Sequence, residues 1–384
     1  MRAPAPPVPG WLAVPIGGGY SPAVPVSQGK RKQNSTLVRL LTGSAKDRPV
    51  FVGGCPRSGT TLLGQMLHAH PMLAMPPETR FVVESFRRRA KFGDLRDEAN
   101  RVAVAEWIVD RKKSRFKDMK LDRDRVVERI RSAPPTIGSL SGAVLEEFAE
   151  VHGASRWGDK RPLHVQLLRI LFRLYPDMQF IHLIRDARGT TASLKKLGWW
   201  GWGAPEALDR WRRAIEAGIA AREYLGPDQY IELRYEDLVD NPVDELHRLA
   251  EFLRIPYTEK MLAHYETGPK LIDKPYHERL AEPVNAAAVE RWRTDLEPEE
   301  LALVEAKVGP LLDEFGYQHL TDLPAVPDEL EQRYRANRKS RDQSTKKAQN
   351  RERKQLGSYT LPVGARLTSG QKRLYYAMKL TGRA

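Results

Sequence analysis

The sequence is poor in cysteine and has no long apolar run. Cys55 is the single cysteine among 384 residues, which excludes an intrachain disulfide framework and a cysteine-rich metal site. No stretch reaches the roughly 18 consecutive apolar residues of a membrane-spanning helix. Prolines interrupt the N-terminal segment APAPPVPGWLAVPIGGG, whereas a signal peptide has a continuous apolar stretch. These absences predict a protein of a reducing compartment, and we expect it to be cytoplasmic.

Acidic residues are missing from the first 46 positions, and positive charge gathers at the two ends of the chain. Residues 1–46 hold six Lys or Arg and no Asp or Glu, and residues 321–384 hold fifteen against six. The net charge of +14 therefore comes from basic ends around a nearly neutral middle. Such ends attract an anionic membrane, an acidic partner or nucleic acid. The simpler interpretation is a solvated, disordered tail.

Composition divides the chain into three parts. Residues 1–46, rich in proline and glycine, are predicted to be a disordered leader with a short helix near 35–41. Residues 47–320 are predicted to form one folded domain. Residues 321–384 form a basic tail that is helical or disordered, and we expect it to lie outside the core because its charges occupy every face.

Short apolar runs alternate with helical patterns across the middle of the chain. The runs at 48–54, 179–184 and 229–235 predict buried strands. Helices are predicted at 60–70, 164–176, 185–196, 207–225, 243–253 and 298–316, with further charged helices between 81 and 152. The alternation indicates an α/β fold in which helices flank a central parallel sheet on both faces.

A phosphate-binding loop without its lysine follows the first predicted strand. The segment GCPRSGTT at 54–61 has both glycines and the final hydroxyl of G-x-x-x-x-G-K-[ST], but Thr60 stands at the lysine position. Backbone amides and the N-terminus of the following helix can bind an anion there. Binding of an anionic ligand is therefore assigned to Arg57, Ser58, Gly59, Thr60 and Thr61.

A second anion-binding group follows the predicted strand at 179–184. Arg185 can hold a phosphate through two parallel hydrogen bonds, and Ser193 lies two helical turns further on. Ligands of a doubly wound sheet bind outside the carboxyl ends of its strands, so both groups should face one ligand. The alternatives are a structural ion pair between Arg185 and Asp186, and a bond from Ser193 to its own helix backbone.

With PRSGTTLL after one strand and RDARGTTAS after another, the sequence resembles the sulfotransferases that use PAPS, 3′-phosphoadenosine 5′-phosphosulfate. The segments HAHPMLAMPPETR (68–80), WGDKRP (157–162), LRYEDLVDNP (233–242) and EPVNAAAVERW (282–292) resemble the tyrosylprotein-sulfotransferase branch and its bacterial relatives. The resemblance implies a three-layer, P-loop-like sulfotransferase fold, PAPS as co-substrate and no metal. PAPS has no γ-phosphate for a loop lysine to contact, and its 3′-phosphate needs a separate binding group.

The resemblance also implies roles for individual residues. Glu78 matches the base that takes the acceptor proton, and Lys160 and Arg57 match cations that stabilise the transferring group. Arg80 matches an arginine near the acceptor, and Tyr235 matches a tyrosine that contacts the nucleotide.

Taken without the resemblance, the same residues have simpler interpretations. Glu78 and Lys160 read as surface charges, and Asp159 or His164 is an alternative base. The tryptophans of LGWWGWG (197–203) either line an acceptor pocket or pack against the core, and packing is slightly favoured.

Two positions depart from the pattern of this branch. Tyr276 stands where the branch has a serine that assists the transition state, and Glu282 stands where it has a lysine. Lys274, His277 and Arg279 are nearby candidates to replace them. The departures leave the acceptor open among peptide tyrosine, glycan, lipid and small molecule.

The sequence as a whole predicts an O-sulfotransferase that moves the sulfuryl group of PAPS to an acceptor hydroxyl by in-line transfer. A non-catalytic nucleotide-binding scaffold is the alternative, because of the departures at Tyr276 and Glu282. A small-molecule kinase is less favoured, because it would need the missing loop lysine.

Overall fold

The computed structural model describes residues 48–197, 203–267 and 289–357. Predictions for the leader 1–46, the tryptophan cluster, Tyr276 with Glu282, and the segment 358–384 lie outside these residues.

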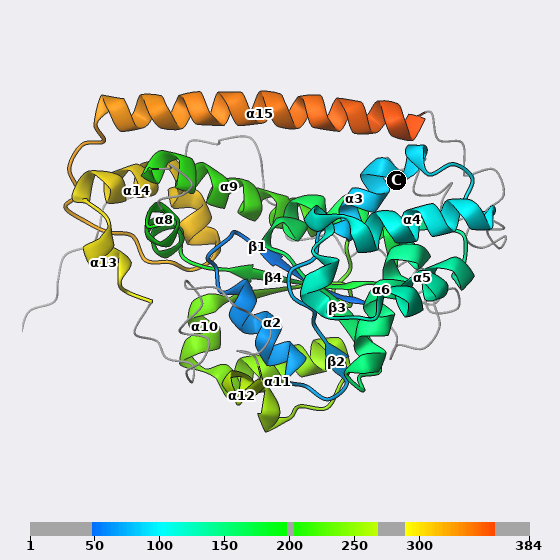
Figure 1. The fold of residues 1–384 in the computed structure, drawn as a ribbon. Helices are drawn as coiled ribbons and strands as arrows, with labels where there is room; N and C mark the ends of the chain where they lie inside the picture. The colour runs from blue at the N-terminus through cyan, green and yellow to red at the C-terminus, as the bar shows by residue number, and fades with distance from the viewer. Residues whose placement is uncertain (1–47, 198–202, 268–288, 358–384) are drawn as a thin grey trace, which may run out of the picture.

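Five parallel strands form the central sheet, in the order β2-β3-β1-β4-β5 (Figure 1). In chain order they are Val50–Gly54 (β1), Leu73–Ala74 (β2), Arg156–Lys160 (β3), Gln179–Ile184 (β4) and Tyr230–Arg234 (β5). Val50 of β1 lies opposite Gly158 of β3 on one side and Gln179 of β4 on the other. The first strand of the chain therefore lies in the middle of the sheet, with β3 and β2 on one side and β4 and β5 on the other.

Strand β1 shows why the sheet is buried on both faces. Its sequence VFVGG alternates between two apolar clusters, because successive side chains of a strand point to opposite faces. Val50 and Val52 belong to the cluster that contains Leu63, and Phe51 belongs to the cluster that contains Trp211. A strand covered on both faces needs a continuous apolar run, which is the pattern that predicted it.

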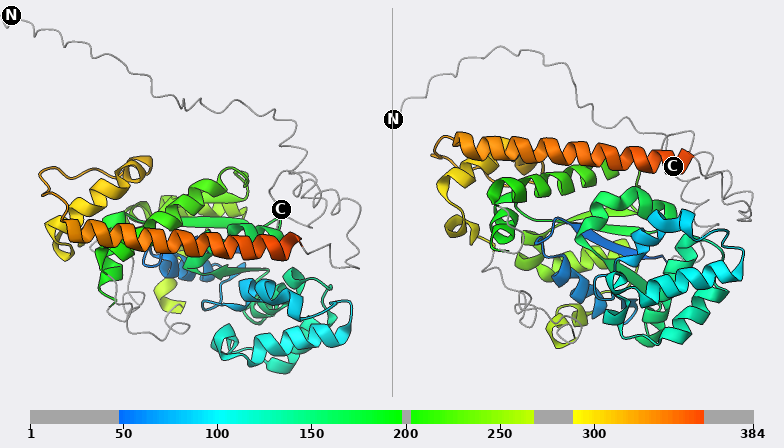
Figure 2. Two further views of the ribbon diagram at one scale, coloured as in Figure 1. Left: turned by 90° about the horizontal axis from the view of Figure 1, so that it is seen from above. Right: turned by 45° about the horizontal axis from the view of Figure 1, so that its top comes forward.

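Helices cover both faces of the sheet (Figure 1), and Figure 2 shows the same arrangement from two other sides. One face carries α2 (Thr60–His68), α10 (Tyr235–Asp240), α11 (Pro242–Leu253) and α12 (His264–Thr267). The other carries α8 (Ala187–Lys195), α9 (Ala204–Ala221) and α14 (Pro298–Glu314), with α13 (Trp292–Asp295) against α8.

The remaining helices before β4 form a lobe beside β2 and β3. They are α3 (Phe81–Arg88), α4 (Glu98–Asp110), α5 (Arg123–Ser132) and α6 (Ile137–Val151), followed after β3 by α7 (Leu168–Leu174). Within the described residues, no helix has both the length and the apolarity needed to cross a bilayer.

The α/β class, the parallel sheet and its flanking helices are confirmed, as are the predicted strands that became β1, β4 and β5. Strand β3 was missed because its sequence RWGDK is polar. Arg156 is nonetheless only 2% exposed. Its guanidinium donates to the backbone oxygens of Arg48 and Leu253 and to the side chain of Gln179, so these bonds offset the burial of its charge.

The charged C-terminal segment forms the long helix α15 (Asp328–Gly357), which crosses above α9 (Figures 1 and 2). Tyr334 is 2% exposed and belongs to the main core cluster, which differs from the expectation that this segment lies outside the core. Arg333 pairs with Glu206 of α9 at 3.0 Å, and Asn337 donates to Asp209 at 3.1 Å. The polar side chains of α15 thus have partners on α9. These contacts leave no apolar periodicity in the sequence of α15.

Replacing Tyr334 with alanine tests whether α15 is part of the folded domain. We expect Tyr334→Ala to lower the free energy of unfolding by about 3 kcal/mol, because it removes a buried aromatic ring. The exposed Lys339 on the same helix supplies a control, and Lys339→Ala should change that energy by less than about 0.5 kcal/mol. Denaturant titration followed by circular dichroism measures both, and equal effects would contradict the packing of α15.

Two histidines in the fold have pKa values far below the ordinary 6.5. Burial, with a contribution from Arg222, lowers the pKa of His182 to about 3. Burial, with a contribution from His152, lowers the pKa of His68 to about 4. His182 Nδ1 is 2.8 Å from the hydroxyl of Tyr230, and its ring lies so close to Gly218 of α9 that a Cβ there would be 2.2 Å from Nδ1.

These histidines predict a loss of stability in mild acid. The unfolded chain binds protons below pH 6.5, whereas the folded histidines stay neutral until the pH approaches 4. Their contribution is therefore complete above pH 6.5, and it falls by about 1.4 kcal/mol per pH unit for each histidine as the pH drops. Denaturant titrations at pH 7, 6 and 5 measure the slope. His182→Gln, which does not titrate, should reduce that slope by about 1.4 kcal/mol per pH unit, the contribution of one histidine, and an unchanged slope would contradict the assignment.

Candidate active site

The residues predicted for the site follow the carboxyl ends of all five strands. Glu78 lies just after β2, Lys160 ends β3, the loop 54–61 follows β1, Arg185 follows β4 and Tyr235 follows β5. Because the strands are parallel, these ends meet at one edge of the sheet. β1 lies at the centre of that edge, where the chain switches from one side of the sheet to the other.

The loop after β1 has the backbone of an anion-binding concavity. Arg57 has a φ of 74° and Gly59 a φ of 90°, and the amide of Ser58 donates to the carbonyl of Cys55 at 3.1 Å. Left-handed residues in such a turn direct successive N–H groups inward. The hydroxyl of Ser58 is buried and has no hydrogen-bond partner among the described residues, and α2 has no acidic residue in its first turn. The loop and helix end therefore present donors to an anion.

Tyr235 packs directly against this loop. A Cβ at Gly59 would lie 2.5 Å from the ring of Tyr235, so no other residue type fits between loop and ring. The guanidinium carbon of Arg185 lies 4.6 Å from the centroid of the same ring, a cation–π geometry. The ring thus connects the strand end at β5 with those at β1 and β4.

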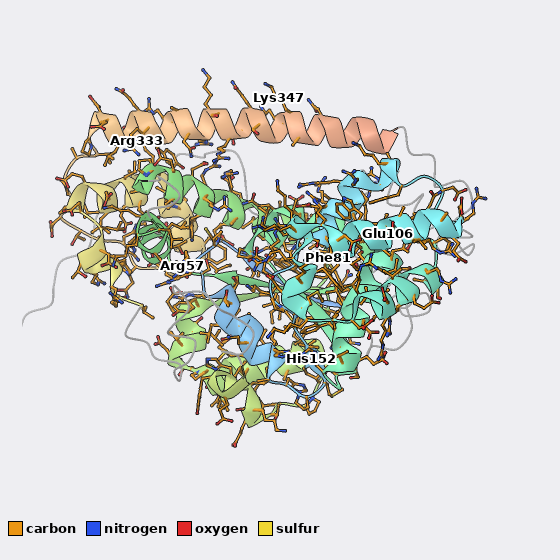
Figure 3. The ribbon with its side chains drawn as sticks, viewed as in Figure 1. Arg57, Phe81, Glu106, His152, Arg333 and Lys347 are labelled. Carbon is orange, nitrogen blue, oxygen red and sulfur yellow. The ribbon has the colours of Figure 1, made fainter. Side chains whose placement is uncertain are left out.

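The two predicted anion-binding groups are hydrogen-bonded to each other. Arg57 Nε donates to Ser193 Oγ at 3.1 Å, and Arg185 Nη1 donates to the carbonyl oxygen of Arg57 at 3.0 Å. Figure 3 shows Arg57 in the space between α2 and α8. The structure therefore brings Arg57, Arg185 and Ser193 into one place. Asp186 caps α8 and pairs with Arg188 at 2.6 Å, and Ser193 bonds across the site to Arg57.

Trp211 of α9 holds the backbone of Arg185 in place. Trp211 was not among the residues predicted for the site. Its indole Nε1 donates to the carbonyl oxygen of Arg185 at 2.7 Å, and the side chain is fully buried. Its only signal in the sequence was its place on the apolar face of the predicted helix 207–225.

Glu78 lies between two cations. Its Oε2 is 3.9 Å from Lys160 Nζ, and its Oε1 is 3.9 Å from Arg161 Nε. The Glu78 side chain is 29% exposed, so its carboxylate is open to a ligand. Lys160 Nζ also donates to Thr61 Oγ1 at 3.2 Å, which places a cation from β3 against the phosphate loop. Arg161 stands in the WGDKRP segment, and no pattern in that segment distinguishes it from a surface arginine.

The alternative base candidates are turned away from any ligand. Asp159 and His164 are 0% and 1% exposed, and His164 Nε2 is 2.8 Å from Asp159 Oδ2. Burial also raises the pKa of the Cys55 thiol to about 12, although Arg210 and Arg213 lower it. The thiol therefore stays protonated at neutral pH and is a poor nucleophile.

Several arginines gather beside the phosphate loop. Burial lowers the pKa of Arg210 on α9, and the positive charges of Arg213, Arg341 and Arg161 add to this effect. Arg80, at the start of α3, is exposed and acts on Arg161 in the same direction. Arginines at the start of α3 and on α9 and α15 thus add positive charge near Arg161 or Arg210, which favours anionic ligands. No pattern in the sequence indicated that Arg341 belongs to this region.

A family model described as Sulfotransferase family matches residues 49–259. The chain belongs to the sulfotransferase family. The match includes the five strand ends and every site residue predicted from the sequence. This sulfotransferase therefore catalyses sulfuryl transfer, and the kinase and scaffold interpretations are set aside.

Curated relatives cover most of this sulfotransferase. Protein-tyrosine sulfotransferase A of Caenorhabditis elegans is 29% identical over 309 residues, which are 77% of this chain and 74% of the relative. Protein-tyrosine sulfotransferase 1 of Homo sapiens is 28% identical over 293 residues, 73% of this chain and 72% of the relative. The predicted resemblance to this branch is thereby confirmed.

Solved structures of other sulfotransferase domains have a similar fold. The sulfotransferase domain of the Synechococcus PCC 7002 olefin synthase has a TM-score of 0.52 and 23% identity, and covers 72% of this chain and 97% of that domain. The sulfotransferase domain from the curacin biosynthetic pathway has the same TM-score, 18% identity, and covers 71% and 99%. The predicted sulfotransferase fold is confirmed, while the roles of individual residues stay predictions.

Proposed function

We propose that this sulfotransferase takes its sulfuryl group from PAPS and holds the two anionic ends of that donor with the two groups described above. In this assignment the 54–61 loop and Arg57 bind the phosphosulfate end, while Arg185 and Ser193 bind the 3′-phosphate. The observation that carries the proposal is the pair of hydrogen bonds joining Arg57 to Ser193 and Arg185 to the Arg57 carbonyl. A donor with one anionic group at each end can use both of these adjacent groups.

Lys160 supplies the positive charge that Thr60 does not. In the loop pattern the lysine belongs to the loop itself, whereas here a lysine reaches Thr61 from the neighbouring strand β3. Lys160 also lies 3.9 Å from Glu78, so it sits between the loop and the proposed base. A cation there stabilises charge that develops on the transferring group and on the bridging oxygen.

Glu78 acts as the general base in the proposed reaction. Its carboxylate accepts the proton of the acceptor hydroxyl while that oxygen forms a bond to sulfur. The bond between sulfur and the bridging oxygen of PAPS breaks, and 3′-phosphoadenosine 5′-phosphate (PAP) leaves with the electron pair. The burial of Asp159 and His164 supports Glu78 over these alternatives.

The proposed acceptor carries a hydroxyl group. Protein tyrosine is the first acceptor to test, because the relatives named above are protein-tyrosine sulfotransferases. Glycans, lipids and small phenols belong in the same panel. Arg80 is placed on the acceptor side, since it is exposed at the start of α3, two residues after Glu78. An anionic membrane or acidic partner for the basic ends is a separate proposal that rests on charge alone.

Calorimetry with the product PAP tests the donor site. We expect PAP to bind about a hundredfold more tightly than AMP, because two charge-assisted contacts hold its 3′-phosphate. Arg185→Ala should remove most of this difference. Lys196→Ala, at the exposed end of α8, is the matched control and should leave both affinities unchanged. Equal binding of PAP and AMP by the unaltered protein would reject the second anion site.

Glu78→Gln tests the base. The amide keeps the size of the side chain and cannot take a proton, so transfer from PAPS should slow by at least about a hundredfold. PAP affinity should stay within about twofold. Glu84→Gln, in the adjacent helix α3, removes a carboxylate that pairs with Arg111 and should keep most of the activity. Normal transfer by Glu78→Gln would remove Glu78 from the role.

A further inference from the structure

A buried polar network lies directly behind Glu78 and Lys160. Thr79 Oγ1 donates to Asp159 Oδ2 at 3.0 Å, and His164 Nε2 is 2.8 Å from the same oxygen. All three side chains are at most 1% exposed, so none of them can touch a substrate.

The network joins the two segments that carry the proposed catalytic groups. Thr79 directly follows Glu78, and Asp159 directly precedes Lys160. Neighbouring side chains of a strand point to opposite faces, so Asp159 points into the core while Lys160 points to the site. The Thr79–Asp159 bond therefore connects the backbone beside the base to the backbone beside the cation.

The two segments differ in how firmly the sheet holds them. Strand β3 is paired with β1, and the amide of Arg161 donates to the carbonyl of Val52 at 3.1 Å just beyond that pairing. Strand β2 consists of two residues, and the segment with Glu78 leaves the sheet after Ala74. A side-chain bond from Thr79 to β3 supplies the connection that strand pairing does not.

The network contains the buried carboxylate of Asp159, although apolar side chains could fill the same space. Burial acts to raise the pKa of Asp159, but the charge and hydrogen bond of His164, with the hydroxyl of Thr79, outweigh it and lower that pKa. Asp159 Oδ1 and His164 Nδ1 have no hydrogen-bond partner within the described part of the chain. A buried charge with unsatisfied atoms adds little stability compared with well-packed apolar residues. A network of this kind therefore contributes more to geometry than to stability.

We propose that Thr79 and Asp159, oriented by His164, are positioning residues that hold the Glu78 carboxylate and the Lys160 amine 3.9 Å apart. At that separation the base and the cation face the same reacting oxygen. The inference rests on the proposed role of Glu78 as base. A displacement of about 1 Å between catalytic groups is enough to reduce a rate by about a hundredfold.

The test compares Thr79→Val with Thr79→Ser. Valine matches the shape of threonine but donates no hydrogen bond, whereas serine keeps the hydroxyl. With PAPS and the acceptor that the unaltered protein sulfates fastest, Thr79→Val should lower kcat by at least about tenfold. Its KM for PAPS and its affinity for PAP should stay within about twofold, because β3 remains paired with β1 and the bond from Lys160 to Thr61 does not depend on Thr79. Thr79→Ser should restore kcat to within about threefold.

A control variant separates positioning from a general loss of stability. Ser141 is fully buried in α6 and lies 2.8 Å from the hydroxyl of Tyr175, away from the strand ends. Ser141→Ala removes a buried hydroxyl as Thr79→Val does, and it should leave kcat unchanged. Crystal structures of both Thr79 variants supply a readout without turnover, and the distance from Glu78 to Lys160 should increase only in Thr79→Val.

Two outcomes would overturn the inference. One is a Thr79→Val protein with the kcat of Thr79→Ser, and the other is an unchanged distance from Glu78 to Lys160 in its crystal structure. Failure of the proposed function is distinguishable, because Glu78→Gln would then transfer normally. If Glu78→Gln is inactive and Thr79→Val is fully active, Glu78 is the base and the network does not position it.

Discussion

The hydrogen bond from Arg185 to the carbonyl oxygen of Arg57 is the contact on which the site depends. It joins the end of β4 to the loop after β1, at a residue, Arg57, that adopts a left-handed conformation. The left-handed conformation costs a residue with a side chain about 1 kcal/mol of conformational free energy. The bond to Arg185 and the contact with Ser193 offset this strain. Two motifs that are far apart in the sequence thereby become one surface.

Around this contact, each neighbouring element contributes one chemical property that the loop lacks. Strand β3 contributes the amine of Lys160, the segment after β2 contributes a carboxylate, and β5 contributes the ring of Tyr235. Helix α9 anchors the backbone of Arg185 through Trp211. In the proposed function, the loop 54–61 is therefore adapted to PAPS by the neighbouring elements more than by its own residues.

Features with strong local signals were predictable from the sequence. The apolar runs of β1, β4 and β5 and the loop residues around Gly59 could be identified, because burial on both faces and tight turns restrict residue type. Strand β3 could not, since Arg156 is buried through hydrogen bonds that lead to three separate parts of the chain. Thr79, Trp211 and Arg341 were missed for the same reason. Their roles arise from contacts between distant segments, and no periodicity records such contacts.

The central position of β1 affects how the chain folds during its synthesis. Among the strands, β1 is synthesised first. Its two hydrogen-bonding edges pair with β3 and β4, which are synthesised much later. A sheet built from such non-local pairs forms slowly. Until β3 and β4 emerge, the VFVGG segment is an apolar strand with open edges, which favours aggregation or capture by a chaperone. The proposed donor site is consequently completed late in synthesis, and a truncated chain that ends before β4 lacks Arg185 and Ser193.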